Sequence, residues 1–201
     1  WKNALLVIVL ALCCAGVSIL FCTMLHQMEH LYKKWIPNEW FRAAAGGCLV
    51  ILMTVLLGTT DYLGAGMPVI ELAMEGKVIA GAFLLKMVFT GVSLGSGYRG
   101  GEIVPSLFVG ATFGCLFGQV TGMSPSLAAA CGMASVFCGV TNCPISSLLL
   151  SFELFGFEGM PFFLLSVCIS YLESGYYGLY HSQKIFYSKT NLQYINTHTK
   201  E

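Results

Sequence analysis

The residues best suited to chemistry lie in a glycine-rich segment that leads directly into an apolar helix. Residues 95–101 contain four glycines within seven positions, which lets the backbone adopt positive φ angles and approach a ligand closely. Pro105 fits only in the first turn of a helix, so the pattern predicts a helix that begins near Glu102. No Asp, Glu, Lys or Arg occurs from Ile103 to Phe152. This predicts that the helix start lies at hydrocarbon depth in a membrane.

Such a helix start favours a binding site for a small anion. The first backbone N–H groups of a helix have no partners within it, and the helix dipole places about half a positive charge at that end. An anion supplies the missing acceptors and the matching charge. Gly100 and Gly101 would let the backbone come close to it. The alternative is that loop carbonyls and the Glu102 carboxylate cap this helix, and composition alone leaves both open.

Glu102 is a candidate for a second role at the same place. A carboxylate at a helix N-terminus is ordinary capping chemistry and stabilises an exposed helix by about 0.3–1 kcal/mol. Burial would favour the protonated acid instead. We therefore hypothesise that Glu102 is a tethered anion or a proton carrier, with capping as the alternative.

The composition indicates an integral membrane protein. Of 201 residues, 56% are hydrophobic and only 10% are charged, whereas charged residues make up about a quarter of a typical soluble domain. The chain has ten basic and ten acidic side chains and therefore no net charge, so its charge gives no indication of a nucleic-acid partner. We expect a multi-pass protein of the plasma membrane, with lipid as its surroundings.

Side chains for metal or enzyme chemistry do not cluster in the sequence. Nine cysteines lie mostly in apolar runs and lack the spacing of a metal site, so we expect them to pack as small hydrophobes, with a disulfide framework as the alternative. The four histidines lie at segment ends. We therefore predict no metal, no cofactor and no enzymatic activity.

The hydrophobic pattern predicts an all-α membrane protein with tilted and broken helices. Prolines mark several helix starts, and the shorter helices cannot all cross a hydrocarbon core of about 30 Å. Glycines at 110, 114 and 118 predict a smooth face for close helix packing. We expect a membrane domain over residues 1–187 and a polar tail over residues 188–201. The predicted helices cover residues 4–34, 39–58, 67–75, 78–94, 102–120, 125–138, 143–155 and 161–177.

Lys86 interrupts the apolar run of residues 78–94. It could be a functional cation inside the membrane. It could also face a water-filled vestibule, or pair with a carboxylate such as Glu102 or Glu153. A structural role of this second kind is the interpretation we favour.

Several segments together resemble the CLC family of chloride channels and chloride/proton antiporters. They are residues 100–111, the glycine repeat that follows, the helix from Cys143-Pro144 to Leu150-Ser151-Phe152-Glu153, and Lys184-Ile185-Phe186-Tyr187. The match extends in order from about Leu5 to Tyr187 and covers only the second half of the family's pattern. The family usually has Gly-Gly-Ile-Phe-x-Pro at the loop. Here Glu102 replaces the isoleucine and Ile103 the phenylalanine.

The resemblance implies one inverted-repeat half of a helical dimer in which each subunit has its own anion pathway. It implies that the backbone N–H groups of Glu102 and Ile103 bind the anion. It also implies that a serine from the first half and a late tyrosine complete the site. Tyr187 matches that tyrosine, and Tyr180 is the weaker candidate. Taken alone, without the resemblance, Tyr187 is more typical of the aromatic belt at a membrane interface.

The function implied is transport of chloride or fluoride. The family's gating-glutamate and serine motifs are absent from this sequence, so a channel and a proton-coupled exchanger both stay open. The chain begins at Trp1 and we expect it to be a piece of something longer. The alternative is a split or truncated half that does not transport alone and is a membrane partner subunit of the missing N-terminal half.

Overall fold

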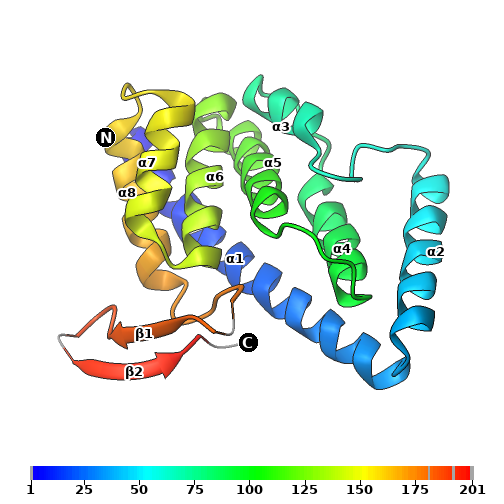
Figure 1. The fold of residues 1–201 in the computed structure, drawn as a ribbon. Coiled ribbons are helices and arrows are strands. Elements are labelled where there is room, and N and C mark those ends of the chain that lie inside the picture. Colours follow the sequence, from blue (N-terminus) through cyan, green and yellow to red (C-terminus); the bar gives the residue numbers. More distant parts are fainter. Residues whose placement is uncertain (1, 181, 192, 200–201) are drawn as a thin grey trace.

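A computed structural model describes residues 2–180, 182–191 and 193–199, and these form eight helices and one two-stranded hairpin (Figure 1). The predicted all-α class is confirmed. Three helices, α1, α2 and α5, are long and apolar enough to cross a membrane. The elements are α1 (Lys2–Trp35), α2 (Glu39–Leu57), α3 (Met67–Met74), α4 (Ala82–Gly95), α5 (Ile103–Thr121), α6 (Pro125–Thr141), α7 (Pro144–Phe155), α8 (Met160–Glu173), β1 (Lys184–Tyr187) and β2 (Tyr194–His198).

Three predicted helix boundaries were wrong by three or four residues. The helix predicted to end at residue 138 continues to Thr141. The helix predicted from residue 78 begins at Ala82, because Gly81 has a φ of 90° and stops the helix from starting earlier. The helix predicted to end at residue 177 ends at Glu173, shortly before Gly175 with a φ of 58°. The segment predicted as a polar tail contains β2, which pairs antiparallel with β1. Alternating exposure along β2 is typical of a strand on a surface.

The α5–α6 pair is the most closely packed part of the fold. The two helices are joined only by Gly122, Met123 and Ser124. A Cβ atom added at Gly110 would lie 2.6 Å from the carbonyl oxygen of Gly132, and one added at Gly114 would overlap the carbonyl of Ala128. The two backbones therefore touch because the side chains are missing. No Lys or Arg occurs between Arg99 and Lys184, so this pair and the two helices after it carry no basic side chain.

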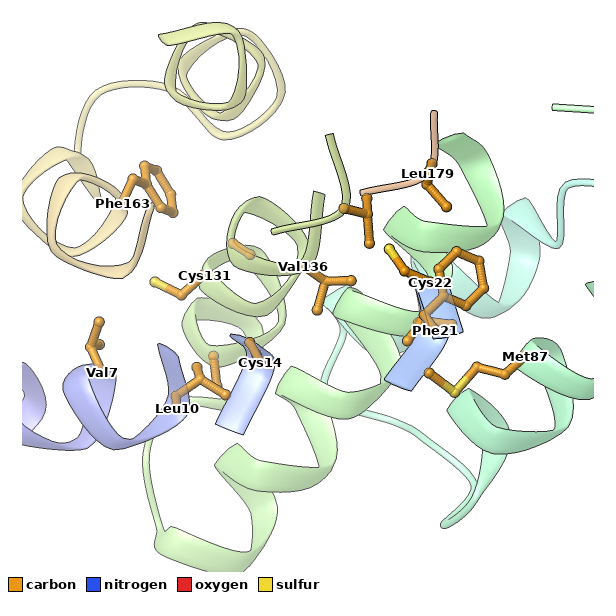
Figure 2. Close-up of a cluster of buried hydrophobic side chains, with 14 of the residues drawn as sticks. Val7, Leu10, Cys14, Phe21, Cys22, Met87, Cys131, Val136, Phe163 and Leu179 are labelled. Atoms are coloured by element: carbon orange, nitrogen blue, oxygen red, sulfur yellow. The ribbon is translucent and has the colours of Figure 1, made fainter. Parts of the chain in front are cut away.

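Helix α1 packs against α4, α6 and α8 and supplies one wall of the core. Figure 2 shows this core, with side chains from α1 facing α4, α6 and α8. All nine cysteines are free thiols, so the disulfide alternative is excluded. Five of them are buried, in agreement with a packing role. The labelled core residues are Val7, Leu10, Cys14, Phe21, Cys22, Met87, Cys131, Val136, Phe163 and Leu179.

Helix α2 stands apart from the bundle (Figure 1). Gly46 is its one buried residue, and large apolar side chains such as Trp40, Val55 and Leu56 are exposed along it. The helix packs chiefly against α4. Its apolar surface is suited to lipid or to another protein segment rather than to water.

Candidate functional site at the amino end of α5

The loop between α4 and α5 brings the glycine-rich segment to the start of α5. Gly97 has a φ of 98°, which reverses the chain after α4. Glu102 is the N-cap residue of α5, and its side chain makes no capping hydrogen bond there. Within the described part of the chain, no backbone carbonyl accepts a hydrogen bond from the N–H of Ile103. The capping alternative that relies on the Glu102 carboxylate is therefore not what the structure contains.

A cavity of about 330 Å³ lies between this loop and α1. Arg99 and Glu102 line it from the loop side, and His26 and Glu29 line it from α1. Leu179 closes it from the segment after α8. Two carboxylates, an imidazole and a guanidinium thus surround one space next to the α5 N-terminus. Such a cluster in a largely apolar protein can bind ions and exchange protons.

A second cavity, of about 340 Å³, lies on another side of the same loop. Gly100 and Gly101 line it, together with Pro105 in the first turn of α5 and Lys86 on α4. Gly100 lines both cavities, so the loop backbone at this residue faces both spaces. Gly101 lines the second cavity only.

Lys86 has a structural role in this second cavity wall. It is only 1% exposed, and its ammonium donates hydrogen bonds to the carbonyl oxygens of Tyr62 at 3.1 Å and Gly64 at 2.7 Å. It also lies 5.0 Å from the ring centroid of Phe108. This agrees with the structural role favoured from the sequence, but the partners are backbone carbonyls of the loop before α3 rather than Glu102 or Glu153.

The two candidate tyrosines lie in different surroundings. Tyr187 is on β1 and 68% exposed, and its ring packs 5.8 Å from that of Tyr194. Tyr180 directly follows Leu179, which lines the cavity of Glu102. Burial raises the pKa of the Tyr180 hydroxyl, and the nearby Glu102 carboxylate raises it further. Tyr180 therefore interacts electrostatically with Glu102, whereas the ring contact of Tyr187 is with Tyr194 in the hairpin.

His26 and Glu29 are the cavity residues that the sequence did not indicate. In the sequence they lie at the polar end of the first helix, and no local pattern indicates which residues they face. A weak signal was present, because residues 22, 26 and 29 share one face of a helix and two of them are polar. Only the fold shows that this face meets Glu102.

No metal centre accompanies these groups. Among the described residues, no set of three His, Cys, Asp or Glu side chains is placed to hold a metal ion.

Comparison with known proteins shows that the sequence is similar to one family of membrane proteins. The sequence profile described as "Voltage gated chloride channel" matches residues 1–175. A chloride/fluoride channel protein of Pseudomonas syringae pv. tomato is 34% identical over 192 residues, which are 90% of this chain and 42% of that protein. The H(+)/Cl(-) exchange transporter ClcA of Vibrio cholerae is 29% identical over 153 residues, which are 68% of this chain and 32% of that protein.

A solved structure gives the same result at the level of the fold. The crystal structure of a CLC-type fluoride/proton antiporter superposes with a TM-score of 0.85 at 30% identity. The match covers 89% of this chain and 45% of that one. The chain therefore spans less than half the length of the relatives it matches.

Proposed function

This chain belongs to the voltage gated chloride channel family, and from that premise we propose that it forms one half of a membrane pathway for a small inorganic anion. The observation that carries the proposal is the open N-terminus of α5, set between two cavities at the glycine-rich loop. A helix start in a largely apolar protein favours a negative charge at that point. The proposal is for transport and not for an enzyme.

The anion is bound by backbone donors in this proposal. The N–H groups of Glu102 and Ile103 point out of the first turn of α5, where the helix dipole adds a partial positive charge. Gly100 and Gly101 allow the anion to approach the backbone without a side chain between them. Pro105 fixes the first turn of the helix and has no N–H of its own to satisfy.

A tyrosine hydroxyl completes the set of donors. The family pattern points to Tyr187, whereas the contacts around Glu102 support Tyr180. A phenol can donate a hydrogen bond to an anion while its ring keeps water out. We assign this role to Tyr180 and keep Tyr187 as the alternative, because a pair of single variants separates them.

Chloride and fluoride are the proposed substrates. The Pseudomonas relative is named for both ions, and the similar crystal structure is titled as a fluoride/proton antiporter. The carboxylate of Glu102 beside the anion site favours coupling to protons over a passive channel. We place the protein in the plasma membrane as a homodimer, with an N-terminal half completing each pathway.

A second candidate is a partner subunit that does not transport alone. The chain spans 32–45% of the length of the relatives described above, and α2 exposes an apolar face that another segment would cover. In that case, the first half of the pathway would come from a separate chain.

Anion efflux from liposomes tests both candidates. The 201-residue chain is reconstituted as wild type, Tyr180→Phe and Tyr187→Phe, and efflux of chloride and of fluoride is followed with ion-selective electrodes. Because the proposal gives this chain only half of each pathway, anion affinity measured by calorimetry is the readout for the two tyrosines. Affinity lost in Tyr180→Phe and kept in Tyr187→Phe supports our assignment, and the reverse supports the family pattern. Anion binding without flux supports a half that needs its N-terminal partner, and flux by this chain alone contradicts that need. A chain that inserts but neither transports nor binds these anions contradicts the proposal.

A further inference from the structure

Helix α1 presents a row of polar side chains to the cavity beside Glu102. His26 and Glu29 are one turn apart, and both line that cavity. Cys22 lies one turn earlier on the same face and is close enough to the Glu102 carboxylate to interact with it electrostatically. The Glu102 side chain is therefore directed toward α1, and His26 lies between it and Glu29 along the helix.

The far end of this row reaches the outside of the fold. Glu29 pairs with Lys33 at 2.6 Å, four residues further along α1, and both side chains are about half exposed. Cys22, at the other end, is fully buried in the core (Figure 2). The row thus runs from the buried side of the anion site to an exposed ion pair.

We propose that His26 and Glu29 form a proton relay between the exterior and Glu102. The inference rests on the proposed function, because it concerns how the carboxylate at the anion site exchanges its proton. No residue on α1 is assigned a role by the family pattern at this site. The relay gives α1 a function beyond its packing.

The relay needs only ordinary acid–base steps. Glu29 takes up a proton from the exterior in exchange for its pairing with Lys33 and donates it to one ring nitrogen of His26, and the other ring nitrogen gives its proton to the Glu102 carboxylate. The O–H bond of Glu29 and one N–H bond of His26 break, and the other N–H bond of His26 and the O–H bond of Glu102 form, so the imidazole ends neutral in its other tautomer. A turn of the ring restores the first tautomer. Imidazole suits this task because its unperturbed pKa is about 6.5, close to neutral pH.

The charges around the cavity are close to balance. Glu29 and Glu102 bring two carboxylates, Arg99 lines the same space, and Lys33 pairs with Glu29. Tyr98 lines the cavity from the loop, and Tyr180 interacts electrostatically with Glu102. A proton delivered to Glu102 removes the negative charge beside the anion site, which favours the anion there.

The rate of proton uptake tests the relay separately from anion binding. The chain in detergent micelles is mixed with sodium fluoride or sodium chloride in weak buffer, and a pH indicator follows proton uptake by stopped flow. Calorimetry on the same samples gives the anion affinity. We expect His26→Ala and Glu29→Gln to slow proton uptake at least tenfold while the anion affinity changes less than twofold.

Two controls distinguish a relay from a structural role. His30→Ala changes a histidine on the same helix that does not line this cavity, and we expect the wild-type rate. Free imidazole added to His26→Ala should restore the rate, which repacking alone would not do. Anion binding without proton uptake in the wild type, or an unchanged rate in His26→Ala, overturns the relay. Absence of anion binding overturns the proposed function and the relay with it.

Discussion

The α5–α6 pair and helix α2 are made of equally apolar segments but are held in different ways. In the pair, glycines bring two backbones into contact along the whole interface. In α2, one glycine is buried and the rest of the helix faces outward. Hydrophobicity therefore suits both regions to a membrane, whereas small residues determine which helices pack together closely.

The contact that α2 does make leads to the anion site. A Cβ atom added at Gly46 would overlap Ser96, which follows α4 at the start of the glycine-rich loop. The Tyr98 hydroxyl donates a hydrogen bond to the carbonyl of Ala43 at 3.0 Å. The loosely packed helix is thus attached to the loop itself. A shift of α2 would act on the loop before it acted on the core.

The largest effect is expected from a side chain placed between α5 and α6. Gly114→Val would push against the backbone of Ala128, and we expect unfolding to become easier by about 3 kcal/mol. Gly16→Val on α1 is the matched control, because nothing lies within 4 Å of a Cβ atom there. Unfolding in mixed detergent micelles measures both. Equal stability of the two variants would contradict the contrast between the regions.

The next effect concerns the loop that connects α2 to the bundle. Lys86→Met would leave the carbonyls of Tyr62 and Gly64 without their donor, and we expect a loss of about 1–3 kcal/mol. Lys77→Met removes an exposed pair with Glu75 and should change the unfolding free energy by less than about 1 kcal/mol. The same unfolding assay applies, and a larger loss in Lys77→Met would show that the buried lysine is not the anchor.

A smaller effect is expected at the α2 contact. Gly46→Val should push α2 away from Ser96 and lower the free energy of unfolding by about 1 kcal/mol, because α2 makes few other contacts that the new side chain would disturb. Ala44→Val lies two residues away on the exposed side and serves as the control. Anion affinity measured by calorimetry should fall in Gly46→Val alone. An unchanged affinity would mean that α2 and the loop are not coupled.

The effect expected at the hairpin, the other peripheral element, depends on pH. Lys189 donates to the carbonyl of Tyr171 at 2.8 Å and lies 4.2 Å from the centroid of that ring. Burial lowers the pKa of the Lys189 ammonium to about 8 from its ordinary value of 10.5. The unfolded chain therefore binds this proton more tightly, so stability should rise as the pH increases from about 8 to about 10.5.

The difference in stability between wild type and Lys189→Met separates the contribution of the Lys189 ammonium from that of other titrating groups. Thermal unfolding midpoints at half-unit pH steps from 7 to 11 should show a positive slope for the wild type relative to the variant within this window. A flat difference, or a slope of opposite sign, would mean that the ammonium is not desolvated in the docked hairpin.

The sequence sufficed for the features that depend on neighbours along the chain. Proline at a helix start and glycine in a loop act locally, so the α5 start could be inferred from residues 100–111. The all-α class followed from the hydrophobic pattern, and the family resemblance followed from residues 100–111 together with the later matching segments. The place of Tyr180 and Tyr187 depends on how the chain turns after α8. The meeting of His26 with Glu102 depends on which face of α1 the bundle covers. These are long-range contacts, and no local pattern encodes them.

The gap in basic residues between Arg99 and Lys184 bears on how the protein is made. Positive charges beside a helix normally tell the insertion machinery which end stays in the cytoplasm. The segments that join α5, α6, α7 and α8 provide no such charge, and only three residues link α5 to α6. The nearest basic residues are Arg99 before α5 and Lys184 after α8. The direction of these four helices across the bilayer therefore depends on charges that lie outside them, at Arg99 and in the segments that flank the four helices.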